Sequence, residues 1–350
     1  MKKFKVIDLF CGIGGFSYGF EMTNSFEVVC AADIWNVAIN TFKLNHSNKK
    51  IELLLKDLTT LNVDFWNKYK NKIDVIIAGP PCQGFSMSGK RKIGDKRNSL
   101  FEEVIKITKK VQPRYVVIEN VVGLLSMVTP NGTNIKNLIL SEFKKIGYKV
   151  DYKVLNAADF GVPQARKRVV FIAAKEYKIS FPKPKLSKKD YVTVGDALGN
   201  VNPNGTKYLK PKTEFQKQMS GRKDICNHER RMSNNLVTKR MSYIPQGGNW
   251  QNIPKRLGTG GGVHSNAYKR LDPKLPSVTI KHAAKAMIIH PTKNRILTVR
   301  EVARLQSFND NFVLTGNTSD QHQQLANAVP PLLGEAIAKE ICKNLKYGKN

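Results

Sequence analysis

The sequence predicts an α/β fold, in which a parallel sheet covered by helices on both faces is joined to a smaller, loop-rich domain. Short apolar runs of strand length alternate with segments of helix length through the first half of the chain, and this alternation is typical of parallel sheets. Beyond residue 175, periodic apolar stretches become rare and glycines become frequent. The 350 residues are enough for two domains with a sizeable core.

Four apolar runs in the first half are expected to be strands, and a glycine, proline or polar residue follows each. The runs cover residues 5–10, 28–32, 74–78 and 114–119. A helix is expected over residues 98–111, and a further strand over residues 169–173. In parallel α/β sheets, ligands bind beyond the carboxyl ends of the strands, so the residues that follow these runs are the candidates for a functional site.

The second half begins with a hinge at residues 181–185, which read Phe-Pro-Lys-Pro-Lys. Helical patterns return over residues 298–305 and 332–345. We therefore expect three parts: the sheet domain over residues 1–183, the loop-rich domain with its hinge over residues 184–292, and a segment that returns to the sheet domain over residues 293–350.

The chain is strongly basic, with 58 lysines and arginines against 27 aspartates and glutamates and a net charge of +31. This excess favours a polyanionic partner, with nucleic acid ahead of a membrane because no basic amphipathic helix stands out. The alternative is that the composition reflects an AT-rich genome. The apolar runs are too short for a membrane span or a signal peptide, so we expect a soluble, cytoplasmic protein without a membrane partner.

Five cysteines are scattered along the chain without a C-x-x-C pair, which disfavours a metal site and is typical of a reducing compartment. They are Cys11, Cys30, Cys82, Cys226 and Cys342. Cys82 stands out because Pro80 and Pro81 fix the turn that presents it. Lys90 and Arg91 in the following loop favour its thiolate form, so Cys82 is the candidate nucleophile. The alternative is a buried structural cysteine.

A glycine-rich loop follows the first strand and reads Cys11-Gly12-Ile13-Gly14-Gly15. Glycines let the backbone turn tightly and approach a ligand closely. Asp33, after the second strand, could accept hydrogen bonds from both hydroxyls of a ribose, and Asp57 could bind an adenine amino group. The alternative is a tight turn with a helix-capping aspartate.

Polar residues near later strands complete the candidate site. Glu119 ends the fourth strand, so we expect it to lie near Cys82 at the same edge of the sheet, where a carboxyl group could hold or protonate a ring nitrogen. Gln164, Arg166 and Arg168 alternate in an extended segment, which predicts that they share one face. The two guanidinium groups would then converge on a base or a phosphate.

These motifs resemble the DNA cytosine-5 methyltransferases of bacterial restriction–modification systems. The resemblance follows the family's order, spans nearly the whole chain and rests on residues 8–16, 79–86, 119–121, 164–168, 270–273, 276–279, 300–308 and 327–330. The chain departs from the family pattern at Ala326, where glycine is usual, and at Asp272, where glutamate is frequent. Both changes are small and leave the candidate catalytic set intact.

The resemblance implies a Rossmann-like domain that uses S-adenosylmethionine to methylate carbon 5 of a cytosine flipped out of duplex DNA, with no metal. Cys82 would add to ring carbon 6 and Glu119 would stabilise the adduct at ring nitrogen 3. Arg166, assisted by Arg168, would hold the base carbonyl oxygen. The cofactor-binding residues that follow from it are Phe10, Gly12, Ile13, Gly14, Gly15, Asp33, Ile34, Asp57, Leu58, Pro81, Leu100, Asn327, Ala328 and Val329.

The loop-rich domain is expected to read the DNA sequence, between about residues 188 and 268, because the motifs for chemistry lie outside it. We expect a monomer that protects host DNA, with a restriction endonuclease acting on the same site as the partner to look for. The residues expected to contact DNA are Gln83, Ser86, Ser88, Lys90, Arg91, Arg97, Gln164, Arg240, Gln246, Gly247, Gly248 and Asn249.

Three other functions fit parts of the sequence. An RNA cytosine-5 methyltransferase of the same fold is disfavoured by the residues after Pro-Pro-Cys, Gln83 to Ser86, and by the long glycine-rich segment. A DNA-binding protein without catalytic activity would be expected to lack Cys82, Glu119 or an arginine, and all are present. A nicotinamide-dependent oxidoreductase is disfavoured because the loop reads G-x-G-G and lacks the dinucleotide pattern.

Overall fold

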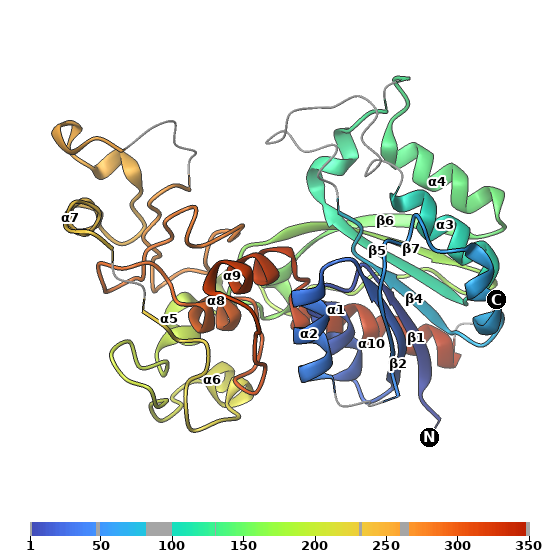
Figure 1. The fold of residues 1–350 in the computed structure, drawn as a ribbon, viewed down its shortest axis with the longest axis horizontal. Coiled ribbons are helices and arrows are strands. Elements are labelled where there is room, and N and C mark those ends of the chain that lie inside the picture. The colour runs from blue at the N-terminus through green and yellow to red at the C-terminus, as the bar shows by residue number, and fades with distance from the viewer. Residues whose placement is uncertain are drawn as a thin grey trace. The chain divides into compact units, whose positions relative to one another are not determined.

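The computed structural model describes residues 2–46, 50–81, 100–129, 131–230, 233–259 and 266–347. Its largest element is a seven-stranded sheet with the order β3-β2-β1-β4-β5-β7-β6 (Figure 1). Neighbouring strands pair in parallel from β3 to β5, whereas β7 runs antiparallel to both β5 and β6. The strands are β1 (Phe4–Leu9), β2 (Phe26–Asp33), β3 (Glu52–Leu55), β4 (Val75–Ala78), β5 (Tyr115–Val121), β6 (Lys149–Asn156) and β7 (Lys167–Ala174).

Helices cover both faces of the sheet (Figure 1). On one face lie α1 (Gly15–Glu21), α2 (Asn36–Asn45) and α10 (Pro331–Tyr347), and on the other lie α3 (Leu100–Val111) and α4 (Ile135–Lys145). The packing of α1 on α10 is so close that a Cβ on Gly19 would lie 2.4 Å from the carbonyl oxygen of Pro331. The final helix of the chain therefore belongs to the sheet domain.

The sequence of α3 shows why this segment is helical. Its buried positions, which include Phe101, Val104 and Ile105, recur every three or four residues and form one apolar face. Acidic residues occupy its first turn and lysines its last turn, which matches the helix dipole. The prediction of a helix over residues 98–111 is confirmed within the described part of that range.

The predicted α/β architecture and the four predicted strands of the first half are confirmed, but the sheet is mixed. The expectation of an all-parallel sheet is wrong at β7, because β6 and β7 follow one another directly and pair as antiparallel neighbours. The strands β3 and β6 were not predicted from the sequence. Both lie at the edges of the sheet, and charged or polar residues interrupt the apolar pattern of β6.

The chain forms two compact units. The first contains residues 1–156, 167–183 and 331–350, and the second contains residues 157–166 and 184–330. The expected domain limits differ from these units at two places. Residues 157–166 group with the second unit, and the expected return to the sheet domain at residue 293 comes only at Pro331.

The second unit contains five α-helices and no β-strand among the residues that the structure describes. Each helix begins after a residue whose side-chain oxygen accepts a backbone N–H of the first turn, so each start is fixed locally. The helices are α5 (Val194–Leu198), α6 (Glu214–Met219), α7 (Asn235–Ser242), α8 (Val299–Leu305) and α9 (Thr318–Asn327).

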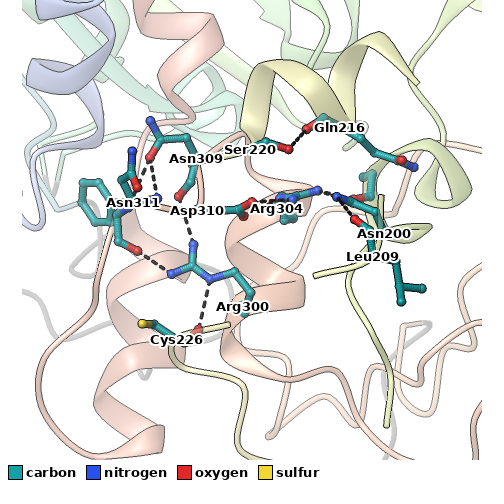
Figure 2. A network of polar contacts seen from close by, with 12 residues as sticks. Asn200, Leu209, Gln216, Ser220, Cys226, Arg300, Arg304, Asn309, Asp310 and Asn311 are labelled. Carbon is teal, nitrogen blue, oxygen red and sulfur yellow. Dashed lines mark hydrogen bonds and ion pairs between the residues drawn. The ribbon is translucent and has the colours of Figure 1, made fainter. Parts of the chain in front are cut away.

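Buried arginines hold the loops of this unit together (Figure 2). Arg304 on α8 forms two charged hydrogen bonds to Asp310, at 2.7 and 2.6 Å, and both side chains are almost completely buried. The same guanidinium donates to the carbonyl oxygen of Ala197 and the amide oxygen of Asn200. One turn earlier, Arg300 donates to three backbone carbonyl groups, those of Cys226, Asn309 and Phe312.

Arg270 has the same role in the rest of the unit. Its guanidinium is buried and donates five hydrogen bonds, with no carboxylate among the acceptors. Since a planar fork of N–H donors can satisfy several carbonyl groups at once, one side chain replaces the backbone pairing that a strand would supply. The acceptors are the carbonyl oxygens of Met241, Ile244, His290 and Lys293 and the side chain of Asn294.

Within the described residues, the structure contains no helix with the length and apolar character needed to cross a membrane. In the same residues, no three histidine, cysteine or acidic side chains are placed to hold a metal ion together.

Candidate active site

The glycine-rich loop begins at the carboxyl edge of the sheet, where β1, β2, β4 and β5 end. Phe10, Gly12 and Gly14 all adopt positive φ angles, so the chain turns sharply between β1 and α1. A Cβ on Gly12 would meet nothing within 4 Å, whereas one on Gly14 would lie 2.2 Å from His46 Nε2. Gly14 is therefore required for packing inside the protein, and Gly12 leaves backbone open for a ligand.

Asp33 fixes this loop from the neighbouring strand. Its carboxylate accepts hydrogen bonds from the backbone N–H groups of Gly12 and Trp35, both at 2.8 Å. Burial raises the pKa of Asp33, and these N–H donors act in the opposite direction. Each carboxylate oxygen keeps a second lone pair, so Asp33 can support the loop and still accept a ligand hydroxyl. Next to it, the apolar side chain of Ile34 is 68% exposed.

The other predicted cofactor residues of the sheet domain are distributed around the same edge. Asp57 follows β3, and one of its carboxylate oxygens accepts hydrogen bonds from the backbone N–H and the hydroxyl of Thr59. These contacts stabilise a local turn. Ile13 and Leu58 are buried, Leu100 is half-buried and Pro81 is exposed. The edge therefore offers an open glycine backbone, carboxylates and apolar side chains, which fits a nucleoside-containing cofactor.

Sequence reasoning missed two supports of the loop. His46 Nδ1 lies 2.7 Å from a carboxylate oxygen of Glu21, and its ring stacks on Phe42 at 3.9 Å, so the imidazole is held against Gly14. Asp8 accepts a hydrogen bond from Ser17 at 2.5 Å, and burial raises the pKa of Asp8 to about 8. A polar residue inside the apolar first strand was the only signal for Asp8, and His46 had none.

The proposed nucleophile, Cys82, lies outside the described residues. The structure does describe Pro80 and Pro81, which precede it. The side-chain amide of Asn120, at the end of β5, donates to the carbonyl oxygen of Pro80 at 3.0 Å. Burial raises the pKa of Cys11 well above its usual value and that of Cys30 to about 12, so both remain thiols. The other predicted residues outside the described part are Gln83, Ser86, Ser88, Lys90, Arg91 and Arg97.

Glu119 and Arg168 form a buried ion pair at the carboxyl edge. Arg168 Nε lies 2.9 Å from Glu119 Oε1, and the two side chains are 11% and 9% exposed. Strand pairing explains the contact, because Arg168 is opposite Val121 and therefore diagonal to Glu119 across β5 and β7. A carboxylate and a guanidinium thus lie together at the edge of the sheet where β4 and β5 end, and Pro80 follows β4 at this edge.

Arg166 and Gln164 have surroundings of their own in the second unit. Arg166 belongs to the second unit, and one of its nitrogens donates to the carbonyl oxygens of Ala326 and Ala328, both at 3.1 Å. It thus fixes the backbone on both sides of the predicted cofactor residue Asn327. Gln164 is completely buried in this unit, so its side chain is not available to DNA here. Of the three residues, Arg168 is the one that lies in β7, and the shared face stays a prediction.

The predicted DNA-reading residues of the second unit separate into two groups. The guanidinium of Arg240 donates to the carbonyl oxygen of Leu257 at 3.1 and 2.8 Å, so it supports a loop. Gln246 is exposed, and its only described hydrogen bond is a 3.4 Å contact to a carbonyl oxygen. The remaining members, Gly247, Gly248 and Asn249, are half-buried around a turn in which Gly247 has a φ of 76°.

The chain matches the model of the C-5 cytosine-specific DNA methylase family over residues 4–343. It is 41% identical over 346 residues to the type II methyltransferase M1.HphI of Haemophilus parahaemolyticus, with 96% of this chain and 86% of that protein covered. It is 34% identical over 368 residues to the type II methyltransferase M.DdeI of Desulfomicrobium norvegicum, with coverages of 96% and 88%.

Solved structures with the same fold span the whole chain. A protein from E. coli, described as a DNA modification methyltransferase encoded within a prophage, has a TM-score of 0.80 and 27% identity, with 98% of this chain and 100% of that chain covered. The Dnmt2 methyltransferase of S. pombe has a TM-score of 0.63 and 16% identity, with coverages of 99% and 100%, and is similar in fold alone.

Proposed function

The chain belongs to the C-5 cytosine-specific DNA methylases, and from this premise we propose that it transfers a methyl group from S-adenosylmethionine to carbon 5 of a cytosine flipped out of a specific duplex sequence. It is a DNA cytosine-5 methyltransferase, like the type II enzymes to which it is similar. The observation that carries the proposal is the buried pair of Glu119 and Arg168, at the sheet edge where the glycine-rich loop begins and where Pro80 follows β4.

The residues at the carboxyl edge fit S-adenosylmethionine. When bound, this cofactor supplies a methyl group on a positively charged sulfur. Gly12 offers open backbone, Asp33 would accept the ribose hydroxyls, and Ile34 would cover one face of the adenine. Asp57 and Leu58, after β3, would contact the other end of the base.

The residues for the chemistry act on the cytosine ring. The Cys82 thiolate adds to carbon 6, which makes carbon 5 nucleophilic, and the adduct later loses the carbon-5 proton and releases Cys82. Glu119 stabilises the adduct at ring nitrogen 3. We assign the base carbonyl oxygen to Arg168, because its guanidinium lies beside Glu119, and we assign Arg166 the role of holding the segment around Asn327.

The activity can be tested on DNA of mixed sequence, so the recognition sequence need not be chosen in advance. The purified protein is incubated with plasmid DNA and S-adenosylmethionine, and converted cytosines are mapped by bisulfite sequencing. We expect complete protection of cytosines at one short sequence and none elsewhere. Methylation of transfer RNA without methylation of the plasmid would instead favour an RNA cytosine-5 methyltransferase.

Replacing Asp33 with alanine is expected to weaken cofactor binding by about 1.5–3 kcal/mol, the range for a hydrogen bond to a charged group. Calorimetry with S-adenosylmethionine measures the change. DNA affinity without cofactor serves as the control and should be the same in the variant and the unchanged protein. Equal cofactor affinity in the two proteins would contradict the proposal that Asp33 binds the ribose hydroxyls.

The two arginines are expected to affect different kinetic constants. Arg168→Gln removes the group beside Glu119 and should lower kcat by about 100-fold or more, as for loss of a positioned donor at the reacting centre. Arg166→Gln releases the carbonyl groups of Ala326 and Ala328 and should mainly raise the KM for the cofactor, by about tenfold. Steady-state kinetics measures both constants. A lower kcat for Arg166→Gln and a higher KM for Arg168→Gln would instead assign the contact with the base carbonyl oxygen to Arg166.

The DNA sequence is read, in this proposal, by loops of the second unit. The segment expected to read DNA, residues 188–268, can be shortened for a domain exchange. Its first part is held by hydrogen bonds from Arg304 to residues 197 and 200 and from Arg300 to residue 226, so this part is left unchanged. Exchanging residues 229–268 for those of a relative with another target should move the methylated sequence to the relative's target. Bisulfite sequencing decides the outcome, and an active hybrid that keeps the original target would place recognition elsewhere.

Within this segment, the exposed side chain of Gln246 is our candidate for contact with a base edge. Gln246→Ala should relax one base position by about 1–3 kcal/mol if the amide makes a bidentate contact in the major groove. The proposal also includes a monomeric state and a restriction endonuclease of the same specificity, and the endonuclease is suggested by the similarity to type II methyltransferases.

A further inference from the structure

A hollow of about 670 Å³ opens at the amino edge of the sheet, where β1, β4 and β5 begin and β7 ends. The amino terminus of the chain lies at this edge, at the start of β1 (Figure 1). All residues that line the hollow belong to the first unit. The opposite, carboxyl edge of the same strands bears the site described above, so the two sites are separated by the length of the strands.

The lining of the hollow is strongly basic. Six of its fourteen residues are lysine or arginine, whereas the whole chain has 58 among 350 residues, so the enrichment exceeds what the composition explains. Only two of the fourteen are acidic, Asp74 and Glu176. The basic residues are Lys2, Lys3, Lys5, Lys72, Arg114 and Lys175.

The carboxylate of Asp74 is already occupied and cannot neutralise the lysines. One of its oxygens lies 3.0 Å from Arg114, and the other accepts the backbone N–H of Lys5 at 2.8 Å. None of the five lysines forms an ion pair with a residue that the structure describes. Five lysines therefore line one hollow, and Glu176 is the acidic residue of the described lining that is not already paired.

The donors that remain suit a chain of phosphates better than a single small anion. Tight sites for one phosphate use convergent backbone N–H groups. Here the N–H groups of Lys5, Lys72 and Lys175 already donate to protein oxygens, at 2.8, 3.0 and 3.1 Å. The charged donors that these lysines keep are ammonium groups on flexible stems, and such groups bind repeated phosphates as point charges, without reading sequence.

The hollow lies at the edge of the sheet opposite to the one where the target cytosine would be bound. β1 is six residues long, which corresponds to about 20 Å at the usual rise of a strand. In the proposed function the target cytosine is presented at the carboxyl edge, so the hollow lies about that distance from the reacting base. The phosphates that reach the hollow must come from another part of the DNA.

We propose that the basic hollow at the amino edge binds the phosphate backbone of a second DNA segment while the first segment is methylated. The choice of DNA as the polyanion rests on the proposed function. The second segment is held through its charge, so binding depends on salt and is independent of sequence. The enzyme can then remain on DNA between successive targets, because it keeps contact with one segment while it releases another.

The test compares two double variants that lose the same charge. Lys72→Gln with Lys175→Gln removes two cations of the hollow. Lys43→Gln with Lys144→Gln removes two exposed lysines of the first unit that do not line it. Each protein is saturated with a short duplex carrying the mapped target, and a fluorescent duplex without the target is then titrated at several salt concentrations. The same titration without the first duplex, and methylation of the short duplex, are measured in parallel.

We expect the hollow variant to bind the second duplex at least fivefold more weakly, with a plot of log affinity against log salt that is shallower by about two, because each lysine that is removed neutralised one phosphate. The control variant should match the unchanged protein, and all three should methylate the short duplex equally. Equal salt slopes in the two variants would overturn the proposal. So would saturable binding of inorganic triphosphate that the second duplex cannot displace. Absence of methylation in all three would instead reject the proposed function.

Discussion

Replacing Cys82 with alanine is expected to abolish methylation completely while folding and DNA binding stay intact. The reason is that the thiolate makes carbon 5 of the ring reactive by adding to carbon 6, and no other group of the chain can substitute for this bond. Incorporation of labelled methyl groups into plasmid DNA measures the loss. Circular dichroism and DNA binding of the same sample show whether the variant is folded.

A duplex with 5-fluorocytosine at the target gives an independent readout. The fluorine cannot leave as a proton would, so the unchanged protein should form a stable covalent adduct on Cys82, which peptide mass mapping can locate. Cys226→Ala is the matched control and should form the same adduct. Cys11 and Cys30 are not expected to react, because burial holds both as thiols. An adduct on any cysteine other than Cys82, or turnover by the alanine variant, would contradict the mechanism.

The central strands could be predicted from the sequence because their apolar runs are continuous. Val75–Ala78 is buried at every position, and such runs are typical of strands covered on both faces. The edge strands β3 and β6 have one open side or a mixed pattern, so their apolar signal is weak. The direction of β7 could not be read from residues at all, because it depends on a short connection that pairs it with β6.

The site shows the same division between what is local and what depends on packing. The roles of Gly12 and Asp33 follow from their places at strand ends, and the structure brings them into contact. Arg168 lies in β7, which begins at Lys167, whereas Arg166 precedes this strand. A pattern of alternating residues predicts a shared face only while the strand continues, so the different partners of the two arginines were beyond the reach of the sequence.

The loop-rich unit was the hardest part to predict, because buried charges replace the apolar periodicity on which prediction relies. Arg270, Arg300 and Arg304 bind mostly backbone carbonyl groups, and any residue can supply a carbonyl group. The residues that accept these hydrogen bonds therefore cannot be recognised from the sequence. The arginines themselves are visible in two of the family segments, residues 270–273 and 300–308, and the structure gives them a purely structural role.

Arg304→Met is expected to destabilise the second unit by about 3–5 kcal/mol, since it leaves the buried carboxylate of Asp310 without the guanidinium that neutralises it. The pair is 0% and 1% exposed, and Asp310 depends on the guanidinium for two hydrogen bonds. Lys217→Met is the matched control, because its pair with Glu214 is 62% and 89% exposed at 3.5 Å, and exposed pairs contribute about 0–1 kcal/mol. Urea unfolding of the full chain measures both changes. Adding Asp310→Leu to Arg304→Met should recover part of the loss, because the unpaired charge is then removed. A midpoint for Arg304→Met within error of the control would show that the buried network does not hold this unit together.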